Sequence, residues 1–204
     1  MISRIFNPIH VKLRIITLIL FFPLIGFAQE RGVGIRLGEP ISITYKDFIE
    51  DYLSIEAMIG SAGVNSSSYY QKDFESNPPA SNAFYIGQNT QKGVSLNLRA
   101  ALHEDFTDEF GIEIGYLLGY AGAGVQFRSV NVTYFYDINQ IGTGPNLTEE
   151  RANIDFGPEA FAGGEYYFDE LPISVFAEVG FFLEILDRVG HIKGQGGIGI
   201  RYLF

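Results

Sequence analysis

The sequence predicts an all-β protein, an eight-stranded antiparallel up-and-down transmembrane β-barrel preceded by a cleaved signal peptide. Three observations support this fold class. Apolar and polar residues alternate at the period of a β-strand through most of the chain, with almost no helical periodicity. The connections between these segments are alternately short and long. The last segment, Gly197–Phe204, carries Ile198, Ile200, Tyr202 and Phe204 on one face and ends on an aromatic residue.

The first 28 residues have the anatomy of a secretory signal peptide. Basic residues open this segment without any acidic residue, and a mostly apolar run follows over 15–27. The small residues Gly26 and Ala28 then stand three positions and one position before the expected cleavage point. Because the apolar run is shorter than the roughly 20 residues of a transmembrane helix, we expect 1–28 to be removed. Residues 29–204 are then expected to fold as one barrel domain.

Turn residues divide the remaining chain into eight segments with strand periodicity. The clearest alternation lies in 94–102, 110–120 and 173–185, where apolar residues occupy every second position. Pro40 separates the first two strands, because proline is poorly tolerated inside a paired strand. A single bulged strand over 32–48 is the alternative. The expected strands are 32–38, 41–48, 52–60, 93–104, 109–121, 153–168, 173–186 and 192–204.

The connections fall into two groups by length and composition. Those at 49–51, 105–108 and 169–172 are short and acidic, whereas 61–92 and 122–152 are long loops rich in Ser, Asn, Gln, Gly and Tyr. In an up-and-down barrel, alternate connections lie at opposite ends, so the short turns are expected at one end and the long loops at the other. Short periplasmic turns and long extracellular loops are typical of outer-membrane barrels.

The apolar face of the strands is expected to contact lipid. The opposite face is rich in glycine and carries charges of both signs, whereas the apolar face of the best strands has no charge over several successive positions. A strand of about ten residues, rising about 3.3 Å per residue and tilted by about 45°, covers roughly 23 Å, close to the apolar band of such barrels.

The inward charges are expected to pair with one another and to plug the barrel. Eight strands enclose an interior just wide enough for side chains to fill, and buried charges are tolerable only when they are paired and hydrogen-bonded. We expect this network to contain Arg36, Lys46, Glu56, Arg99, Glu113, Glu159, Glu165, Glu178 and Arg201.

Composition and motifs argue against several classes of function. The net charge of −10 disfavours nucleic-acid binding, which depends on neutralising phosphates. The absence of cysteine excludes disulfides and thiolate metal sites. No phosphate-binding glycine loop, metal-spaced histidine cluster or nucleophile elbow is found. His103 and His191 are expected at the rims of the barrel without a nucleophile beside them. We therefore expect no enzymatic activity, no catalytic residue, no cofactor and no metal.

The closing strand resembles the C-terminal signal strand of bacterial outer-membrane β-barrels, which the barrel-assembly machinery reads through residues such as Ile200, Tyr202 and Phe204. With the segments Gly32–Gly38 and Ile43–Phe48, it makes the chain similar to the OmpA-like and OmpX-like eight-stranded barrels and to porin-family-like barrels of Bacteroidetes. The resemblance covers the layout of essentially the whole mature chain. It implies location in the cell outer membrane and assembly by that machinery, and it implies no substrate.

The expected function is therefore that of an outer-membrane protein with a side-chain-filled lumen, not an open pore. It would act in envelope structure or in surface recognition, with outer-membrane lipid and an extracellular ligand of the loops as partners. Alternation over 125–141 predicts a hairpin above the membrane with exposed edges suited to strand addition. The alternatives are a soluble lipocalin-like barrel around a lipophilic ligand, and an outer-membrane lipid-modifying enzyme. Inward apolar residues would mark the first. An inward histidine within hydrogen-bonding reach of a serine and a carboxylate would mark the second.

Overall fold

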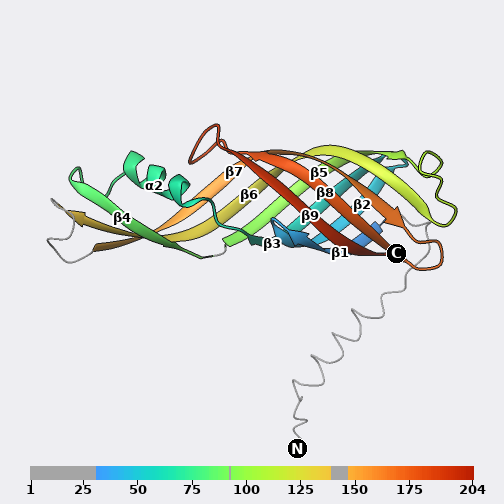
Figure 1. The fold of residues 1–204 in the computed structure, drawn as a ribbon, viewed down its shortest axis with the longest axis horizontal. Coiled ribbons are helices and arrows are strands. Elements are labelled where there is room, and N and C mark those ends of the chain that lie inside the picture. Colours follow the sequence, from blue (N-terminus) through green and yellow to red (C-terminus); the bar gives the residue numbers. More distant parts are fainter. Residues whose placement is uncertain (1–30, 92, 139–146) are drawn as a thin grey trace, which may run out of the picture. The chain divides into compact units, whose positions relative to one another are not determined.

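A computed structural model describes residues 31–91, 93–138 and 147–204 (Figure 1). The expected signal peptide, 1–28, lies outside the described residues, and so does the part of the second long loop at 139–146. The described elements belong to one compact unit, Glu30–Leu203. Within these ranges, no helix combines the length and the apolar character needed to cross a membrane.

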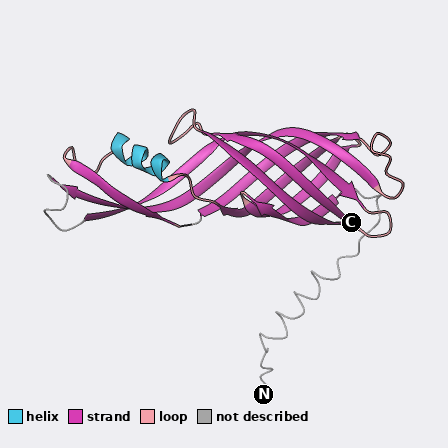
Figure 2. Cartoon of the chain, in the orientation of Figure 1, coloured by secondary structure: helices cyan, strands magenta, loops and turns pink. Residues whose placement is uncertain are grey.

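Almost all the regular structure of the described residues is β, with one helix among nine strands (Figure 2). The strands are β1 (Arg31–Gly38), β2 (Ile41–Glu50), β3 (Leu53–Ala62), β4 (Ala83–Thr90), β5 (Gly93–Asp105), β6 (Tyr116–Ile138), β7 (Leu147–Tyr167), β8 (Ile173–Leu183) and β9 (Ile192–Leu203), and the helix is α2 (Ser67–Ser76).

Eight of these strands form a closed antiparallel ring. The order is β6-β5-β3-β2-β1-β9-β8-β7, and a further pairing of β7 with β6 closes it. The prediction of an eight-stranded up-and-down barrel is confirmed, and Arg31–Glu50 forms two paired strands, not one bulged strand. Closure leaves no unpaired edge around the ring, which a sheet in lipid requires because lipid offers no hydrogen-bond partners.

The connections divide between the two ends of the ring as predicted, since every neighbouring pair of ring strands is antiparallel. The turns β2–β3, β5–β6 and β7–β8 lie at one end. The β1–β2 and β8–β9 connections lie at the other end, together with the described chain between β3 and β5, the end of β6 and the start of β7 (Figure 1).

Strand β6 begins at Tyr116, later than the strand predicted over 109–121, so the first half of that prediction is wrong. Residues 106–115 form a turn in which Gly111 and Gly115 have φ angles of 62° and 75°. Such positive φ values leave the extended region and interrupt a strand. The alternation over 110–120 predicts that Tyr120 faces lipid. This prediction is also wrong, because the side chain of Tyr120 points inward and is 8% exposed.

The two long connections, predicted as loops with a hairpin over 125–141, contain more regular structure than predicted. The first contains α2 and β4, and the second is mostly the extended ends of β6 and β7. Beyond the ring, β4 pairs with residues 132–138 of β6, and β7 continues beside them. We call α2, β4, residues 130–138 and residues 147–153 the projection; it is the left-hand part of Figure 1. Of the segment 125–141, predicted as a hairpin above the membrane, residues 130–138 lie in the projection, 125–129 pair with β5 in the ring, and 139–141 are outside the described ranges.

Candidate functional site

The barrel has a polar interior and an apolar exterior. In β2, Ile43 is 59% exposed, whereas the neighbouring Thr44 and Lys46 are 0% and 5% exposed. Aliphatic side chains such as Ile35 and Leu98 are likewise exposed on the outer surface of the ring. This is the inverse of a lipocalin-like barrel, which keeps its apolar residues inside, so the soluble alternative is wrong. An exterior of this kind is stable in hydrocarbon and costly in water.

Cations and carboxylates fill the middle of the lumen in equal numbers. They come from every ring strand except β6, and each residue is at most 7% exposed. We call this set the lumen network, and its members are Arg36, Lys46, Arg99 and Arg201 with Glu56, Glu159, Glu165 and Glu178.

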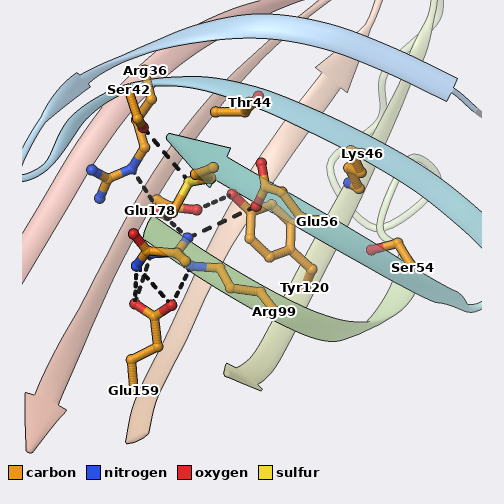
Figure 3. Close-up of polar contacts among 12 residues, drawn as sticks. Arg36, Ser42, Thr44, Lys46, Ser54, Glu56, Arg99, Tyr120, Glu159 and Glu178 are labelled. Carbon is orange, nitrogen blue, oxygen red and sulfur yellow. Dashed lines mark hydrogen bonds and ion pairs between the residues drawn. The ribbon is translucent and has the colours of Figure 1, made fainter. Parts of the chain in front are cut away.

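Arg99 organises one half of the lumen network. Its Nε and Nη2 donate to the two carboxylate oxygens of Glu159 at 2.9 and 3.1 Å, and its Nη1 donates to Glu178 Oε1 at 2.7 Å (Figure 3). Arg36 Nε donates to the same Glu178 oxygen at 2.7 Å, while the Tyr120 hydroxyl donates to Glu178 Oε2 at 3.2 Å. Two-point contacts between guanidinium and carboxylate are among the strongest hydrogen bonds in proteins.

Arg201 organises the other half. Its Nη1 donates to Glu165 Oε2 at 2.7 Å, and its Nη2 donates to Glu56. Lys46 Nζ donates to the same oxygen of Glu165 at 2.8 Å. Glu56 Oε2 also lies 3.8 Å from Arg99 Nη1, which connects the two halves. With equal numbers of cations and carboxylates, the lumen network is neutral, and this is the condition under which buried charges are tolerated.

Inward-facing glycines make room for these large side chains. A Cβ atom at Gly124 would lie 2.9 Å from Arg99 Cγ, and one at Gly199 would lie 2.3 Å from the ring of Phe176. That ring lies 3.8 Å from the guanidinium of Arg201, an attractive cation–π contact. Side chains at these glycine positions would displace the network.

The structure brings together all the predicted network residues except Glu113. Its inclusion is wrong, because the strand assumed to carry it begins only at Tyr116, and Glu113 is exposed in the preceding turn. Of the expected assembly signal, Ile200 and Tyr202 are 47% and 51% exposed on the outer face of β9, and Phe204 follows that strand. Their recognition by the assembly machinery stays a prediction.

A second charged layer, towards the projection, was missed in the predicted network. Arg128 of β6 is 1% exposed; its Nη2 donates to the carbonyl oxygen of Gly63 at 2.5 Å and lies 3.5 Å from Glu39 Oε1. Its Nη1 lies 3.5 Å from Asp155 Oδ2, and Lys193 is paired with Glu39. Arg128 falls within the predicted loop 122–152, although it continues the inward parity of β6 and is two residues from Gln126, which is fully buried.

His103 lies inside the barrel near the short-turn end, in contact with a serine. Its Nε2 is 2.8 Å from Ser54 Oγ, and the ring packs against Phe48 and Tyr120 with centroid separations of 4.6 and 5.4 Å. Among the described residues, His103 Nδ1 has no hydrogen-bond partner, so the carboxylate that would orient a catalytic imidazole is missing. Ser54 is only 1% exposed, which denies a substrate access to its hydroxyl.

The projection has a small apolar core of its own. Tyr70 and Phe74 of α2 pack against Val132 and Tyr134 of β6, all at most 1% exposed. Val132 and Tyr134 lie on the same face of β6 as the residues that point into the lumen. This face of the strand is therefore polar within the barrel and apolar in the projection. The Tyr134 hydroxyl donates to Asp73 at 2.7 Å; burial and this bond raise the pKa of Tyr134, which therefore stays a donor.

Comparisons with known proteins identify a related fold without assigning a family. No family model matches the sequence, and no curated protein matches it. The N-terminal β-barrel domain of Pseudomonas aeruginosa OprF aligns over 86% of this chain and 96% of that chain, with a TM-score of 0.51 and 14% identity. Ail, the attachment invasion locus protein of Yersinia pestis, covers 86% of this chain and 96% of its own at a TM-score of 0.41 and 10% identity. The second similarity is too weak to carry an argument.

The fold and the distribution of polarity define the class of protein. The chain forms a small transmembrane β-barrel of the outer-membrane type, with charges inside and an apolar exterior. The shared fold with the OprF barrel domain confirms the OmpA/OmpX-like architecture predicted from the sequence.

Proposed function

We propose that this chain is a non-enzymatic outer-membrane protein whose lumen is filled with side chains and whose projection recognises a partner outside the cell. The observation that carries the proposal is the neutral lumen network, lying within an apolar wall and beside a projection with its own core. Paired charges of this kind favour a closed lumen over an ion-conducting pore, because each charge is already satisfied by a fixed partner.

The closed lumen is tested by conductance. In planar lipid bilayers with potassium chloride, the refolded mature protein is expected to give no stable single-channel steps, whereas an open porin under the same conditions does. The physical reason is that ions would have to displace Arg99 and Arg201 from carboxylates at 2.7–3.1 Å. Reproducible steps of constant size that change in Arg99→Met would show that the lumen conducts and would contradict the proposal.

Two free sheet edges support the recognition role of the projection. The strand β4 is the terminal strand of the sheet, and β7 pairs with β8 only from Glu159 onwards, which leaves the outer side of 147–153 without a strand neighbour among the described residues. Phe84 and Ile86 on β4 are 42% and 41% exposed. Natural proteins protect free edges of this kind unless the edge serves a purpose. Backbone pairing with an external strand is one such purpose.

The register of the ring offers a clean way to remove the projection. Ala62 pairs with Gly93, and Ser129 pairs with Ile154. Replacing 63–92 and 130–153 with Asn-Gly turns therefore joins cross-strand neighbours and leaves the ring pairing intact. A matched control replaces only 139–146, between the paired ends of β6 and β7.

The expected result is a loss of surface contacts without a loss of the barrel. Intact cells are treated with a membrane-impermeant amine-reactive cross-linker, and the protein is then isolated. The wild type and the control should carry cross-linked partners that the shortened variant lacks, while all three keep the heat-dependent gel mobility of a folded barrel. Identical cross-links in the shortened variant would disprove recognition by the projection. A cross-link pattern limited to envelope components would favour a role in envelope structure.

A further inference from the structure

Three carboxylates meet where the ring passes into the projection. Oxygen atoms of Asp155 in β7, and of Glu184 and Asp187 in the β8–β9 connection, all lie within 4.8 Å of one another. Asp155 and Glu184 are both 0% exposed, and Asp187 is exposed. We call these residues the mouth cluster.

The two buried carboxylates share one hydroxyl donor. The Tyr69 hydroxyl oxygen lies 3.1 Å from Asp155 Oδ1 and 2.8 Å from each oxygen of Glu184. A phenol has one proton to donate. It can satisfy only one of these carboxylates at a time, so the other faces an oxygen lone pair. A positive charge between them would remove this conflict.

The surrounding cations do not balance the cluster. Arg128 Nη1 is 3.5 Å from Asp155, but the same guanidinium also serves Glu39, and Lys193 is paired with Glu39. The guanidinium of Arg188 lies over the Tyr69 ring at 4.8 Å, and within the described residues it forms no ion pair. The second charged layer, which contains the mouth cluster, therefore holds more carboxylates than paired cations, whereas the lumen network is neutral.

Two buried asparagines beside the mouth cluster each have an unsatisfied oxygen. Asn153 is 3% exposed and Asn65 is 8% exposed, and the Oδ1 of each has no hydrogen-bond partner in the described parts of the chain. Their amide nitrogens lie 2.9 Å from Asp187 Oδ2 and 3.2 Å from Asp155 Oδ2. Rotation of each amide exchanges its nitrogen and oxygen and turns the unsatisfied oxygen towards that carboxylate. Buried polar atoms without partners are rare, and a bound ion is one of the arrangements that explains them.

We propose that the mouth cluster is a binding site for a divalent cation, with Ca²⁺ the preferred ion. Asp155, Glu184 and Asp187 supply carboxylate oxygens, and Asn65 and Asn153 supply amide oxygens after their side chains rotate. A set made only of oxygen donors selects a hard cation over zinc or copper. Calcium accepts six to eight oxygens at about 2.3–2.6 Å in adaptable geometry and tolerates ligands from separate segments.

The bound ion joins three parts of the chain. Asn65 lies two residues before α2, Asn153 and Asp155 belong to β7, and Glu184 and Asp187 lie in the β8–β9 connection. Calcium is therefore expected to fasten the start of α2 to the rim of the barrel. A folded barrel binds the ion better than an unfolded chain does, so the ion raises the melting temperature.

The test uses the refolded mature protein in detergent, freed of metal with a chelator. Isothermal titration with calcium chloride is expected to show one site, and thermal unfolding should shift upwards when calcium is present. In Asp187→Asn, which removes one charge at an exposed position, the affinity should fall by about tenfold or more, because calcium affinity follows the charge of the ligands. The matched control is Glu170→Gln, an exposed carboxylate in the β7–β8 turn at the opposite end of the ring.

Each outcome decides the proposal. Binding that is weakened in Asp187→Asn and unchanged in Glu170→Gln supports the site. Equal weakening in both variants, or no calcium heat and no thermal shift in the wild type, overturns it and assigns the neutralising charge to a proton. As a check that does not depend on thermal unfolding, Tb³⁺ bound to the folded protein should show luminescence sensitised by tyrosine, since the sequence has no tryptophan. Tyr69→Phe should reduce that signal, and an unchanged signal would place the ion elsewhere and overturn the assignment.

Discussion

Replacing Arg99 with methionine is expected to lower the free energy of unfolding by about 3–5 kcal/mol, because removal of one partner leaves buried carboxylates uncompensated. Arg99 is 3% exposed and holds Glu159 and Glu178 together. Methionine has a similar length, so the change removes the charge and hydrogen bonds more than the volume. Urea-induced unfolding in phospholipid vesicles measures the loss. Arg99 lies on β5, so the substitution leaves the sequence of the C-terminal strand unchanged.

The control for this experiment is Arg31→Met. Arg31 pairs with Asp47 at 3.1 Å, but its side chain is 59% exposed, and pairs of this kind contribute about 0–1 kcal/mol. The contrast between the two variants isolates burial from charge pairing as such. Equal effects of the two substitutions, or a loss below about 1 kcal/mol for Arg99→Met, would mean that water reaches the lumen and screens its charges.

Replacing Leu98 with arginine is expected to cost about 2–4 kcal/mol in a lipid bilayer, the range for a basic residue at the midplane on the lipid-facing side of a barrel. Leu98 is 59% exposed in the middle of β5, and it pairs with Ala57 and Val125 in the central part of the ring. The free energy of unfolding in vesicles measures the cost. In a soluble protein, an arginine at so exposed a position would be nearly neutral.

Val189→Arg is the matched control, because it introduces the same charge at an exposed apolar position outside the expected bilayer. Val189 is 79% exposed in the β8–β9 connection, outside the strands that form the ring, so its substitution is expected to change stability by less than about 0.5 kcal/mol. A stability loss that is the same at both positions would argue against a bilayer around the middle of the ring. A gain in water solubility for Leu98→Arg with unchanged stability would do the same.

Strand alternation predicted most of the barrel because the two faces meet different surroundings. Isoleucine, leucine and valine on one face and charges on the other are sufficient to place Arg36, Lys46 and Glu178 inside, since a shift of one residue would exchange lipid and lumen. The same rule failed at 110–115. There the sequence alternates as a strand would, but Gly111 and Gly115 adopt positive φ angles and Asp169 accepts a hydrogen bond from the amide of Gly115 at 2.8 Å. That bond comes from the neighbouring turn and has no local signal.

The projection was poorly predicted for a related reason. Its helix is short, and the aromatic spacing of Tyr70 and Phe74 is compatible with a helix only if a surface exists to bury them. That surface is the apolar continuation of β6 at Val132 and Tyr134, which closes over α2 only in the folded chain. Short helices gain most of their stability from such packing and little from intrinsic propensity.

Local sequence patterns were sufficient for the strand count of the ring, for the lipid-facing side of every clearly alternating strand except the one predicted over 109–121, and for the ends at which the turns fall. These properties depend on local periodicity and on the parity of an up-and-down chain. Which charges pair depends on the closed ring, because Arg36 and Glu178 are 142 residues apart in sequence and meet only after closure. The tertiary structure also brings Asp155, Glu184 and Asp187 together beside Tyr69. Long-range pairing of this kind follows from the register of the closed ring, and no local pattern encodes it.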